Sequence, residues 1–264
     1  MCVDLRRGIS RGTCITTGMP LIRPYFRALQ ERFVRATRES GDHINDISIP
    51  RSVRTLNLNR YQFALGFSNR KAVLDIGCGH GYGSFLLSQH ASSVIGLDRD
   101  EAAICAAKER FARANITFVC REAIDFLRRS GRRFDLITMF EVLEHLESQE
   151  LLLELILKTL KSNGMLLLST PNKRYTTIFR RNPYHVHEFD LKELVRLVES
   201  AGFCVHDAYG LLPGALMYIP LPYYTLMRLV QLIPSYSKFL QPNTSPATSR
   251  TLLLLLKSCN STPR

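Results

Sequence analysis

Short apolar runs alternate with amphipathic stretches through the middle of this chain. The stretches between the runs repeat apolar residues at helical spacing and predict helices over about 84–90, 101–114, 123–129, 149–161 and 190–201. The apolar runs predict strands over residues 72–76, 93–98, 116–120, 134–140, 164–170 and 203–209. Because strands that alternate with such helices need right-handed crossovers, the pattern predicts an α/β fold with a mainly parallel sheet.

The two flanks of the chain follow a different pattern. Residues 24–38 predict a basic amphipathic helix, which could be a lid, an interfacial helix or a helix packed on the sheet edge. Residues 56–65 predict a helix leading into the first strand. The apolar insert 211–242 is broken by prolines and contains no acidic residue, which suits a bilayer interface, the roof of an apolar pocket or ordinary packing on the sheet. The expected organisation is an N-terminal extension with a lid helix over 1–55 and one α/β domain over 56–264.

Composition and charge narrow the setting. At 264 residues and 45% hydrophobic, the chain is long enough for one well-buried domain. The net charge of +12 divides into +8 over 1–72, −1 over 73–210 and +5 over 211–264, so the basic residues lie in the flanks. Such flanks suit a membrane surface or a polyanion, and a merely solvated basic face is an equal alternative.

The cysteines and the apolar runs indicate a compartment. The seven cysteines are odd in number and contain no C-x-x-C pair, which favours a reducing compartment without a disulfide framework or a zinc site. The N-terminus lacks the pattern of a secretory signal, and no run is long enough to span a membrane. The expected location is the cytoplasm, either free or peripheral on the inner face of a membrane.

A glycine-rich turn follows the first predicted strand, in the stretch from Asp75 through Gly77 and Gly79 to Gly81. Such turns hold nucleotides in doubly wound sheets, but the dinucleotide pattern G-x-G-x-x-G fits poorly here. Asp75 would repel a pyrophosphate and suits the ammonium of an amino-acid ligand. Asp98 ends the second predicted strand, where a carboxylate accepts hydrogen bonds from ribose hydroxyls. A ribose without phosphates that carries an amino acid is S-adenosylmethionine.

With these motifs in this order, the chain resembles the class I S-adenosylmethionine-dependent methyltransferases from about residue 58 to 202, and among them the group of ubiquinone-biosynthesis O-methyltransferases and type 11 methyltransferases. The resemblance implies a Rossmann-like, doubly wound, seven-stranded sheet of order 3-2-1-4-5-7-6, with helices on both faces and residues 251–257 as the antiparallel seventh strand. It implies that Glu122 binds the adenine amino group, and that Arg60 and Tyr61 belong to a helix closing over the cofactor. The predicted cofactor-binding residues are Asp75, Gly77, Cys78, Gly79, Asp98, Glu122, Ala123 and Phe140.

A second constellation, Glu141, Glu144 and His145, directly follows the fourth predicted strand. In a helix these residues share one face and form half of a site for a divalent metal such as Mg²⁺. The pattern resembles E-x-x-E-H followed by a later histidine in two branches, the ubiquinone-biosynthesis O-methyltransferases and the small-RNA 3′-terminal 2′-O-methyltransferases. This resemblance places His185 at the last ligand position and leaves His187 spare. The stretch 169–172 also matches the family and is expected to line the acceptor side.

The candidate chemistry leaves several interpretations open. A metal held by Glu141, Glu144, His145 and His185 would lower the pKa of an acceptor hydroxyl. Without a metal, His145 or His185 could act as a general base. Alternatively, Glu141 and His145 could be structural or only shape the acceptor pocket.

The expected function is methyl transfer from S-adenosylmethionine to an oxygen of a small or lipid-linked molecule, such as a quinone precursor or a sugar. The alternatives are RNA 2′-O-methylation and a non-catalytic cofactor-binding scaffold. A membrane surface could bind through residues 211–242 and the basic N-terminal helix. Nucleic acid is the less favoured partner, because no RNA-binding module or aromatic stacking platform is visible.

Overall fold

The computed structural model describes residues 51–176, 184–213, 229, 232, 242–243 and 245–259. These residues lie within one compact unit, Ser48–Arg264. The predicted helix over 24–38 and most of the apolar insert 211–242 lie outside the described residues. Within the described part, no helix is both long enough and apolar enough to cross a membrane.

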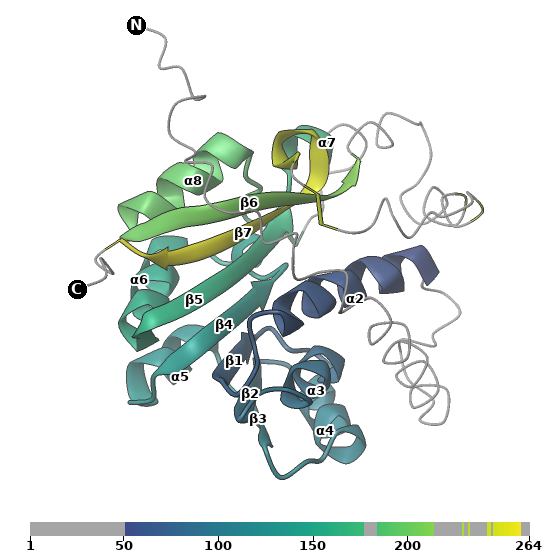
Figure 1. The fold of residues 1–264 in the computed structure, drawn as a ribbon, viewed down its shortest axis with the longest axis vertical. Helices are drawn as coiled ribbons and strands as arrows, with labels where there is room; N and C mark the ends of the chain where they lie inside the picture. The colour runs from purple at the N-terminus through teal and green to yellow at the C-terminus, as the bar shows by residue number, and fades with distance from the viewer. Residues whose placement is uncertain are drawn as a thin grey trace, which may run out of the picture. The chain divides into compact units, whose positions relative to one another are not determined.

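A seven-stranded sheet forms the centre of the fold (Figure 1). Its order is β3-β2-β1-β4-β5-β7-β6, and β7 runs antiparallel to both of its neighbours. The predicted sheet order and the antiparallel last strand are therefore confirmed. The strands are β1 (Ala72–Ile76), β2 (Ser93–Asp98), β3 (Ile116–Cys120), β4 (Phe134–Phe140), β5 (Leu160–Pro171), β6 (Phe203–Pro213) and β7 (Ser249–Ser258).

Helices cover both faces of the sheet (Figure 1). The group α2, α3 and α4 lies on one side, and the group α5, α6 and α8 lies on the other. The helices are α2 (Arg51–Leu65), α3 (Tyr82–Ser88), α4 (Glu101–Arg110), α5 (Ala123–Arg129), α6 (Gln149–Thr159), α7 (Lys173–Thr176) and α8 (Leu191–Ser200), with short 3₁₀ turns at Leu143–His145 and Pro246–Thr248. Because α2 begins at Arg51, it runs across the predicted boundary between residues 55 and 56.

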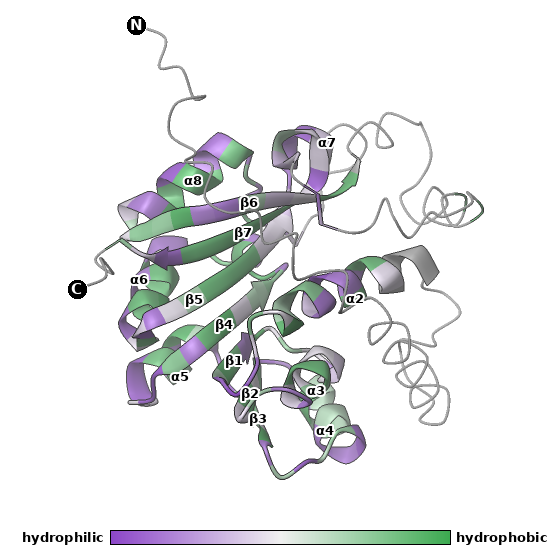
Figure 2. Cartoon of the chain, viewed as in Figure 1, coloured by the Kyte–Doolittle hydropathy of each residue, from purple (hydrophilic) through white to green (hydrophobic). Residues whose placement is uncertain are grey.

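The core explains why the apolar runs form strands. Leu252 through Leu256 in β7 are at most 1% exposed, because neighbouring strands flank β7 and side chains cover both of its faces. Figure 2 shows the hydrophobic residues concentrated in β4, β5 and β7. Helix starts follow local chemistry: the Asp100 side chain accepts hydrogen bonds from the Ala102 and Ala103 amides at the start of α4.

Two features of local structure differ from what the sequence indicated. The helical condition for a face shared by Glu141, Glu144 and His145 is not met, because Glu141 takes a left-handed backbone conformation (φ 56°) and only Leu143–His145 make a 3₁₀ turn. Cys204 and Cys259 form a disulfide, which the cysteine pattern did not indicate. They are 55 residues apart in sequence, and the antiparallel pairing of β6 with β7 brings their Cα atoms to 4.9 Å.

Candidate functional site

The glycine turn between β1 and α3 is built for close backbone approach. Gly77 has a φ of 74°, and a Cβ added there would collide with Val142, which follows β4. At Gly83, inside α3, an added Cβ would collide with the ring of Tyr61 from α2. The turn therefore packs directly against the end of β4, and α3 packs directly against α2.

Asp75 lies beneath the glycine turn, at the centre of a group of buried hydroxyls. Its carboxylate is completely buried and accepts hydrogen bonds from Thr138 Oγ1 (2.7 Å), Ser84 Oγ (2.7 Å) and Tyr61 Oη (3.2 Å). Burial raises the pKa of Asp75 to about 6, although the three hydroxyl donors oppose the rise. Asp75 thus ties α2, α3 and β4 together beneath the turn, and its contact with a ligand ammonium stays a prediction.

A pocket of about 430 Å³ opens at the carboxyl ends of β1, β2 and β4. Of the predicted cofactor-binding residues, Gly77, Asp98, Glu122 and Ala123 line it. Asp75, Cys78, Gly79 and Phe140 do not line it. The remaining lining residues are Ile76, Leu97, Arg99, Arg121, Glu141, Val142, His145, Leu146 and Tyr184.

The predicted cofactor-binding residues that do not line the pocket support the conformation of the glycine turn. The Gly79 amide donates to Asp98 Oδ2 (2.8 Å), which links the glycine turn to the acid at the end of β2. Cys78 is buried, and burial raises the pKa of its thiol far above the usual range. The Phe140 ring packs edge-on against Tyr61, with 5.1 Å between the ring centres.

One end of the pocket carries charged side chains that the sequence only partly indicated. Glu122 precedes α5, is more than half exposed and forms an ion pair with Arg99 (3.6 Å). Arg99 follows Asp98 directly, a position that could have flagged it, whereas no sequence signal singled out Arg121 or Tyr184. Asp98 is half-buried and placed to meet a ligand at this end.

Glu144, His145 and His185 converge beside the pocket. Each offers one potential ligand atom, and these atoms all lie within 4.8 Å of one another. His145 also lines the pocket, so the cluster adjoins the space that Gly77 and Asp98 line. The structure thus brings together three of the four predicted metal ligands.

Hydrogen bonds orient both imidazoles of this cluster. His145 Nδ1 lies 2.8 Å from the Tyr184 carbonyl oxygen and must donate to it, because a carbonyl only accepts. His185 Nδ1 lies 2.6 Å from Glu188 Oε1, a carboxylate–histidine pair of the kind that orients metal-binding imidazoles. In both rings Nε2 is then the nitrogen suited to a metal or a proton.

Glu144 supplies a desolvated carboxylate. Thr170 Oγ1 donates to its Oε2 (3.0 Å), while its buried Oε1 has no hydrogen-bond partner among the described residues. Burial, and then the nearby charge of Glu141, raise the pKa of Glu144 to about 8. A buried, incompletely satisfied carboxylate beside two imidazoles fits a divalent cation.

Glu141 stays outside this cluster. Its Oε1 accepts a hydrogen bond from Ser169 Oγ (3.0 Å) and faces the guanidinium of Arg60 at 3.4 Å. Within the stretch 169–172, Ser169 and Thr170 therefore orient the carboxylates of Glu141 and Glu144 by hydrogen bonds.

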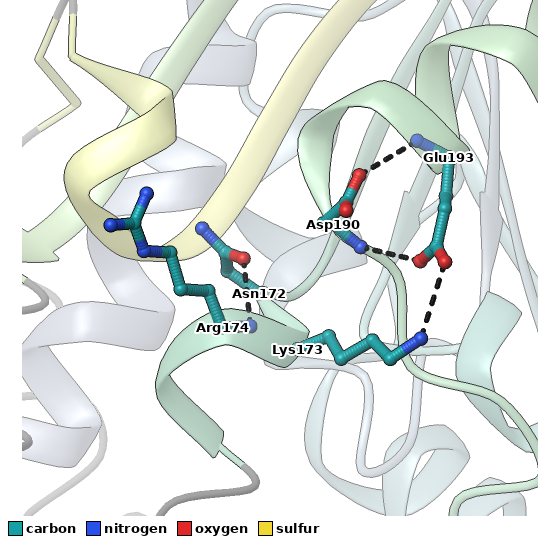
Figure 3. A network of polar contacts seen from close by, with 5 residues as sticks. All are labelled: Asn172, Lys173, Arg174, Asp190 and Glu193. Carbon is teal, nitrogen blue, oxygen red and sulfur yellow. Dashed lines mark hydrogen bonds and ion pairs between the residues drawn. The ribbon is translucent and has the colours of Figure 1, made fainter.

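The loop that carries His185 is fixed from two sides. The Val186 and His187 amides donate to the Glu144 carbonyl oxygen (2.8 and 3.2 Å). On the other side the Lys173 amide donates to the carbonyl of Phe189, just ahead of α8 (2.9 Å). Figure 3 shows the polar network there, in which Lys173 contacts Glu193 of the α8 capping box and the Asn172 side chain accepts from the Arg174 amide; its members are Asn172, Lys173, Arg174, Asp190 and Glu193.

Comparison with known proteins gives the class first. The profile of a family described as a methyltransferase domain matches residues 51–208, more than half of the chain. The chain belongs to this family, and with its sheet order it is a class I S-adenosylmethionine-dependent methyltransferase.

Individual relatives carry similar names. The chain is 36% identical over 149 residues to a probable S-adenosylmethionine-dependent methyltransferase of Mycolicibacterium smegmatis, covering 54% of this chain and 56% of that protein. It is 31% identical over 157 residues to the ubiquinone biosynthesis O-methyltransferase of Coxiella burnetii, covering 53% and 67%. The match to the mycobacterial relatives thus extends over little more than half of their length.

Solved structures share the fold. A putative S-adenosylmethionine-dependent methyltransferase from Listeria monocytogenes has a TM-score of 0.56 at 15% identity, covering 77% of this chain and 96% of that one. The [4+2]-cyclase SpnF has a TM-score of 0.58 at 16% identity, with 77% and 81% covered. The N-methyltransferase NodS from Bradyrhizobium japonicum, in complex with S-adenosyl-L-homocysteine, has a TM-score of 0.56 at 15% identity, with 86% and 98% covered. At these identities the likeness shows the fold alone, and the fold does not determine the reaction.

Proposed function

We propose that this methyltransferase methylates an oxygen of a small or lipid-linked hydroxylated molecule, such as a quinone precursor or a sugar. The observation that carries the proposal is the cluster of Glu144, His145 and His185, whose member His145 lines the same pocket as Gly77 and Asp98. Methyl transfer to a hydroxyl oxygen needs a group that accepts the hydroxyl proton. An oriented imidazole beside a carboxylate can accept it. Similarity to a ubiquinone biosynthesis O-methyltransferase supports the same class of acceptor.

We further propose that Glu144, His145 and His185 hold a divalent cation such as Mg²⁺ or Mn²⁺. Oε1 of Glu144 has no hydrogen-bond partner among the residues that the structure describes, and together with the oriented imidazoles it fits such an ion. When bound, the cation would supply Lewis acidity toward an acceptor hydroxyl. In its absence His145, with Nδ1 held by the Tyr184 carbonyl, is the group placed to accept a proton through Nε2.

A methyl-transfer assay with three alternative acceptors tests the proposal. The purified chain is incubated with methyl-labelled S-adenosylmethionine and either a catechol, a reducing sugar or a short RNA with a free 2′-hydroxyl at its 3′ end. Label transferred to an oxygen of the catechol or the sugar supports the proposal. Transfer to the RNA alone would replace it with the RNA alternative, and cofactor binding without transfer to any of the three would favour a scaffold.

Substitutions locate the chemistry. Glu144→Gln and His185→Ala should each reduce Mn²⁺ binding by calorimetry at least about tenfold, because each removes one of the few ligands. His187→Ala is the matched control, since His187 lies on the same loop and its ring meets Phe189 edge-on outside the cluster. If His187→Ala reduces Mn²⁺ binding as much as His185→Ala does, the cluster is not the cation site.

A further inference from the structure

The connections at the amino ends of the strands carry positive charge and no negative charge. They are residues 66–71, 89–92, 111–115, 130–133 and 201–202, together with residues 160–164 at the start of β5. These segments contain six Lys or Arg and no Asp or Glu. The pocket opens at the carboxyl ends of β1, β2 and β4, where Asp98, Glu122 and Glu141 line it. The two ends of the sheet therefore differ in charge.

Five of the six cations lie at three adjacent strands. Arg70 and Lys71 directly precede β1, and Arg132 and Arg133 directly precede β4. Lys161 is the second residue of β5. Because β1, β4 and β5 are parallel neighbours, their starts lie side by side within roughly 10 Å across the sheet (Figure 1). These five residues are called the basic face below.

Hydrogen bonds hold the segments of the basic face together. The Arg133 guanidinium donates to the Leu160 carbonyl oxygen (3.2 Å), which links the start of β4 to that of β5. Asp135 Oδ2 accepts from the Ala72 amide (2.9 Å) and from Lys161 Nζ (2.8 Å), which links β4 to β1 and to β5. The cations therefore extend from backbone segments that are fixed to one another.

The charge of the basic face is largely unneutralised within the described residues. Asp135 is the acid that contacts it. Burial opposes ionisation of this carboxyl, but hydrogen bonds from Lys161 and Ala72 and the charges of Lys161 and Lys71 lower its pKa. Arg70 and Arg132 are exposed and form no ion pair with a described residue. Five cations and one ionised carboxylate leave a net charge of +4.

Helix termini do not account for these cations. Positive side chains in the last turn of a helix complement its dipole, and the effect falls off within that turn. Helix α2 ends at Leu65 and α5 ends at Arg129, whereas the cations at 70–71 and 132–133 lie three or more residues further on. Like charges held this close repel one another, and a polyanionic partner relieves the repulsion.

The surroundings of the basic face favour a nucleic acid over a membrane. The exposed large apolar residues of the described chain are Tyr184, Val186, Leu229 and Leu232, and none of them lies in the connections at the amino ends. Exposed Asn and Ser side chains lie among the cations instead, at positions 69, 162 and 163. Such side chains, with Arg and Lys, bond phosphate oxygens and the 2′-hydroxyls of RNA.

We infer that the basic face binds the sugar–phosphate backbone of single-stranded RNA. The face and the pocket lie at opposite ends of the strands, roughly 15 Å apart along β1. The bound RNA is therefore a partner and not the methyl acceptor. The inference is independent of the proposed acceptor and cation.

Fluorescence anisotropy of an end-labelled oligouridylate of about 20 nucleotides measures this contact in the full chain, at several salt concentrations. The triple variant Arg70→Asn, Lys71→Gln, Arg132→Gln removes three charges, and Asn suits the left-handed backbone at position 70 (φ 55°). It should weaken binding at least about tenfold at low salt. The slope of log affinity against log salt should become shallower by about 2, since each neutralised phosphate contributes roughly 0.7.

A matched control removes the same charge elsewhere. Lys108→Gln, Lys192→Gln, Arg196→Gln changes three exposed residues of α4 and α8 and should weaken RNA binding less than about threefold. Both triple variants should bind S-adenosylhomocysteine as the parent chain does, which shows that they are folded. Equal weakening of RNA binding by the two triple variants would overturn the inference, and so would no RNA binding by the parent chain.

Other ligands test the choice of RNA. Equal or tighter binding of an oligothymidylate of the same length would overturn it, because a 2′-hydroxyl would then contribute nothing. Unchanged RNA affinity in the first triple variant, with loss of binding to phosphatidylglycerol vesicles, would make the basic face a membrane contact. Mutual exclusion of RNA and S-adenosylhomocysteine would place the RNA at the pocket and contradict the inference.

A single substitution keeps the test informative if the first triple variant does not fold. Arg132→Gln changes one exposed residue of the turn before β4. It should weaken oligouridylate binding about threefold at low salt and leave S-adenosylhomocysteine binding unchanged. Full RNA affinity in a folded Arg132→Gln variant would count against the basic face.

Discussion

At the scale of single residues, burial assigns different roles to chemically similar acids. Asp75 is fully buried among three hydroxyl donors and serves the architecture of the glycine turn. Glu141 and Asp98 line the pocket and can meet a ligand directly. Glu144 lies between these cases, since it is buried yet has one oxygen without a hydrogen-bond partner in the described part of the chain. The residue type alone does not separate these roles.

The raised pKa of Asp75 predicts a specific dependence of stability on pH. Its pKa is about 6 in the folded chain against an ordinary value of 3.8, so the folded state binds more protons between these values. The free energy of unfolding should therefore fall as pH rises from about 4 to about 6, by up to about 3 kcal/mol, and change little through this group above that range.

Urea denaturation between pH 4 and 7 checks this expectation. Asp75→Asn cannot titrate, so it should reduce the fall in stability between about pH 4 and pH 6 by up to about 3 kcal/mol, while the fall that the raised pKa of Glu144 causes should remain. Asp125→Asn, at a half-exposed carboxylate on α5, is the control and should keep the dependence of the parent chain. An unchanged profile in Asp75→Asn would mean that Asp75 does not titrate in this range.

At the scale of elements, the antiparallel β7 completes the sheet and ties β6 to it. The Cys204–Cys259 disulfide joins the start of β6 to the end of β7. The disulfide lies at the amino end of β6. The pocket lies at the other end of the strands, at the carboxyl ends of β1, β2 and β4. The disulfide therefore supports the fold without contacting the site.

Removal of the disulfide should lower stability and leave cofactor binding intact. A cross-link that closes a loop of 55 residues stabilises by up to about 4 kcal/mol through the entropy of the unfolded chain. The double variant Cys204→Ser, Cys259→Ser should lose a large part of this in urea denaturation under oxidising conditions. Its affinity for S-adenosylhomocysteine should match that of the parent chain.

The exposed free cysteines provide the control. Cys105→Ser with Cys120→Ser removes two thiols without breaking a cross-link and should change stability little. If the parent chain and the Cys204→Ser, Cys259→Ser variant unfold at the same urea concentration without reductant, the two cysteines are not cross-linked in the purified protein.

At the scale of the whole molecule, charge and apolar residues are distributed unevenly. The flanks 1–72 and 211–264 carry net charges of +8 and +5, and the apolar insert 211–242 contains no acidic residue. Basic and apolar segments together favour binding to anionic membrane surfaces. We therefore propose a membrane surface as a partner, in keeping with a lipid-linked acceptor.

Vesicle co-sedimentation of the full chain tests this proposal. Binding should be stronger to vesicles containing phosphatidylglycerol than to phosphatidylcholine alone, and it should weaken with added salt. The structure indicates which residues of the insert can be deleted. Leu211 and Leu212 are buried in β6 and should be kept. Gly210 and Asn243 exchange two backbone hydrogen bonds of 2.8 Å. Residues 214–241 can thus be replaced by a short glycine linker, because the flanking segments already meet.

The deletion should reduce vesicle binding while S-adenosylhomocysteine binding persists. Retained cofactor binding shows that the shortened chain is folded, which separates loss of a membrane contact from loss of structure. Equal sedimentation of the full chain with and without vesicles would contradict the proposal that the protein binds a membrane surface.

The sequence by itself determined the sheet and one end of the site. Strand and helix positions follow from local periodicity, and Gly77 and Asp98 could be located because a turn and the end of a strand are local features. Both residues line the pocket. The resemblance to known methyltransferases supplied the strand order that periodicity cannot give.

Only the tertiary structure decided which side chains meet. Asp75 is saturated by hydroxyls from α2, α3 and β4, Glu141 turns to Arg60 and not to Glu144, and β6 pairs with β7 so that two distant cysteines join. Each of these contacts links residues far apart in the chain or depends on an unusual backbone angle. Local patterns contain no information on such contacts, because packing of whole elements sets them.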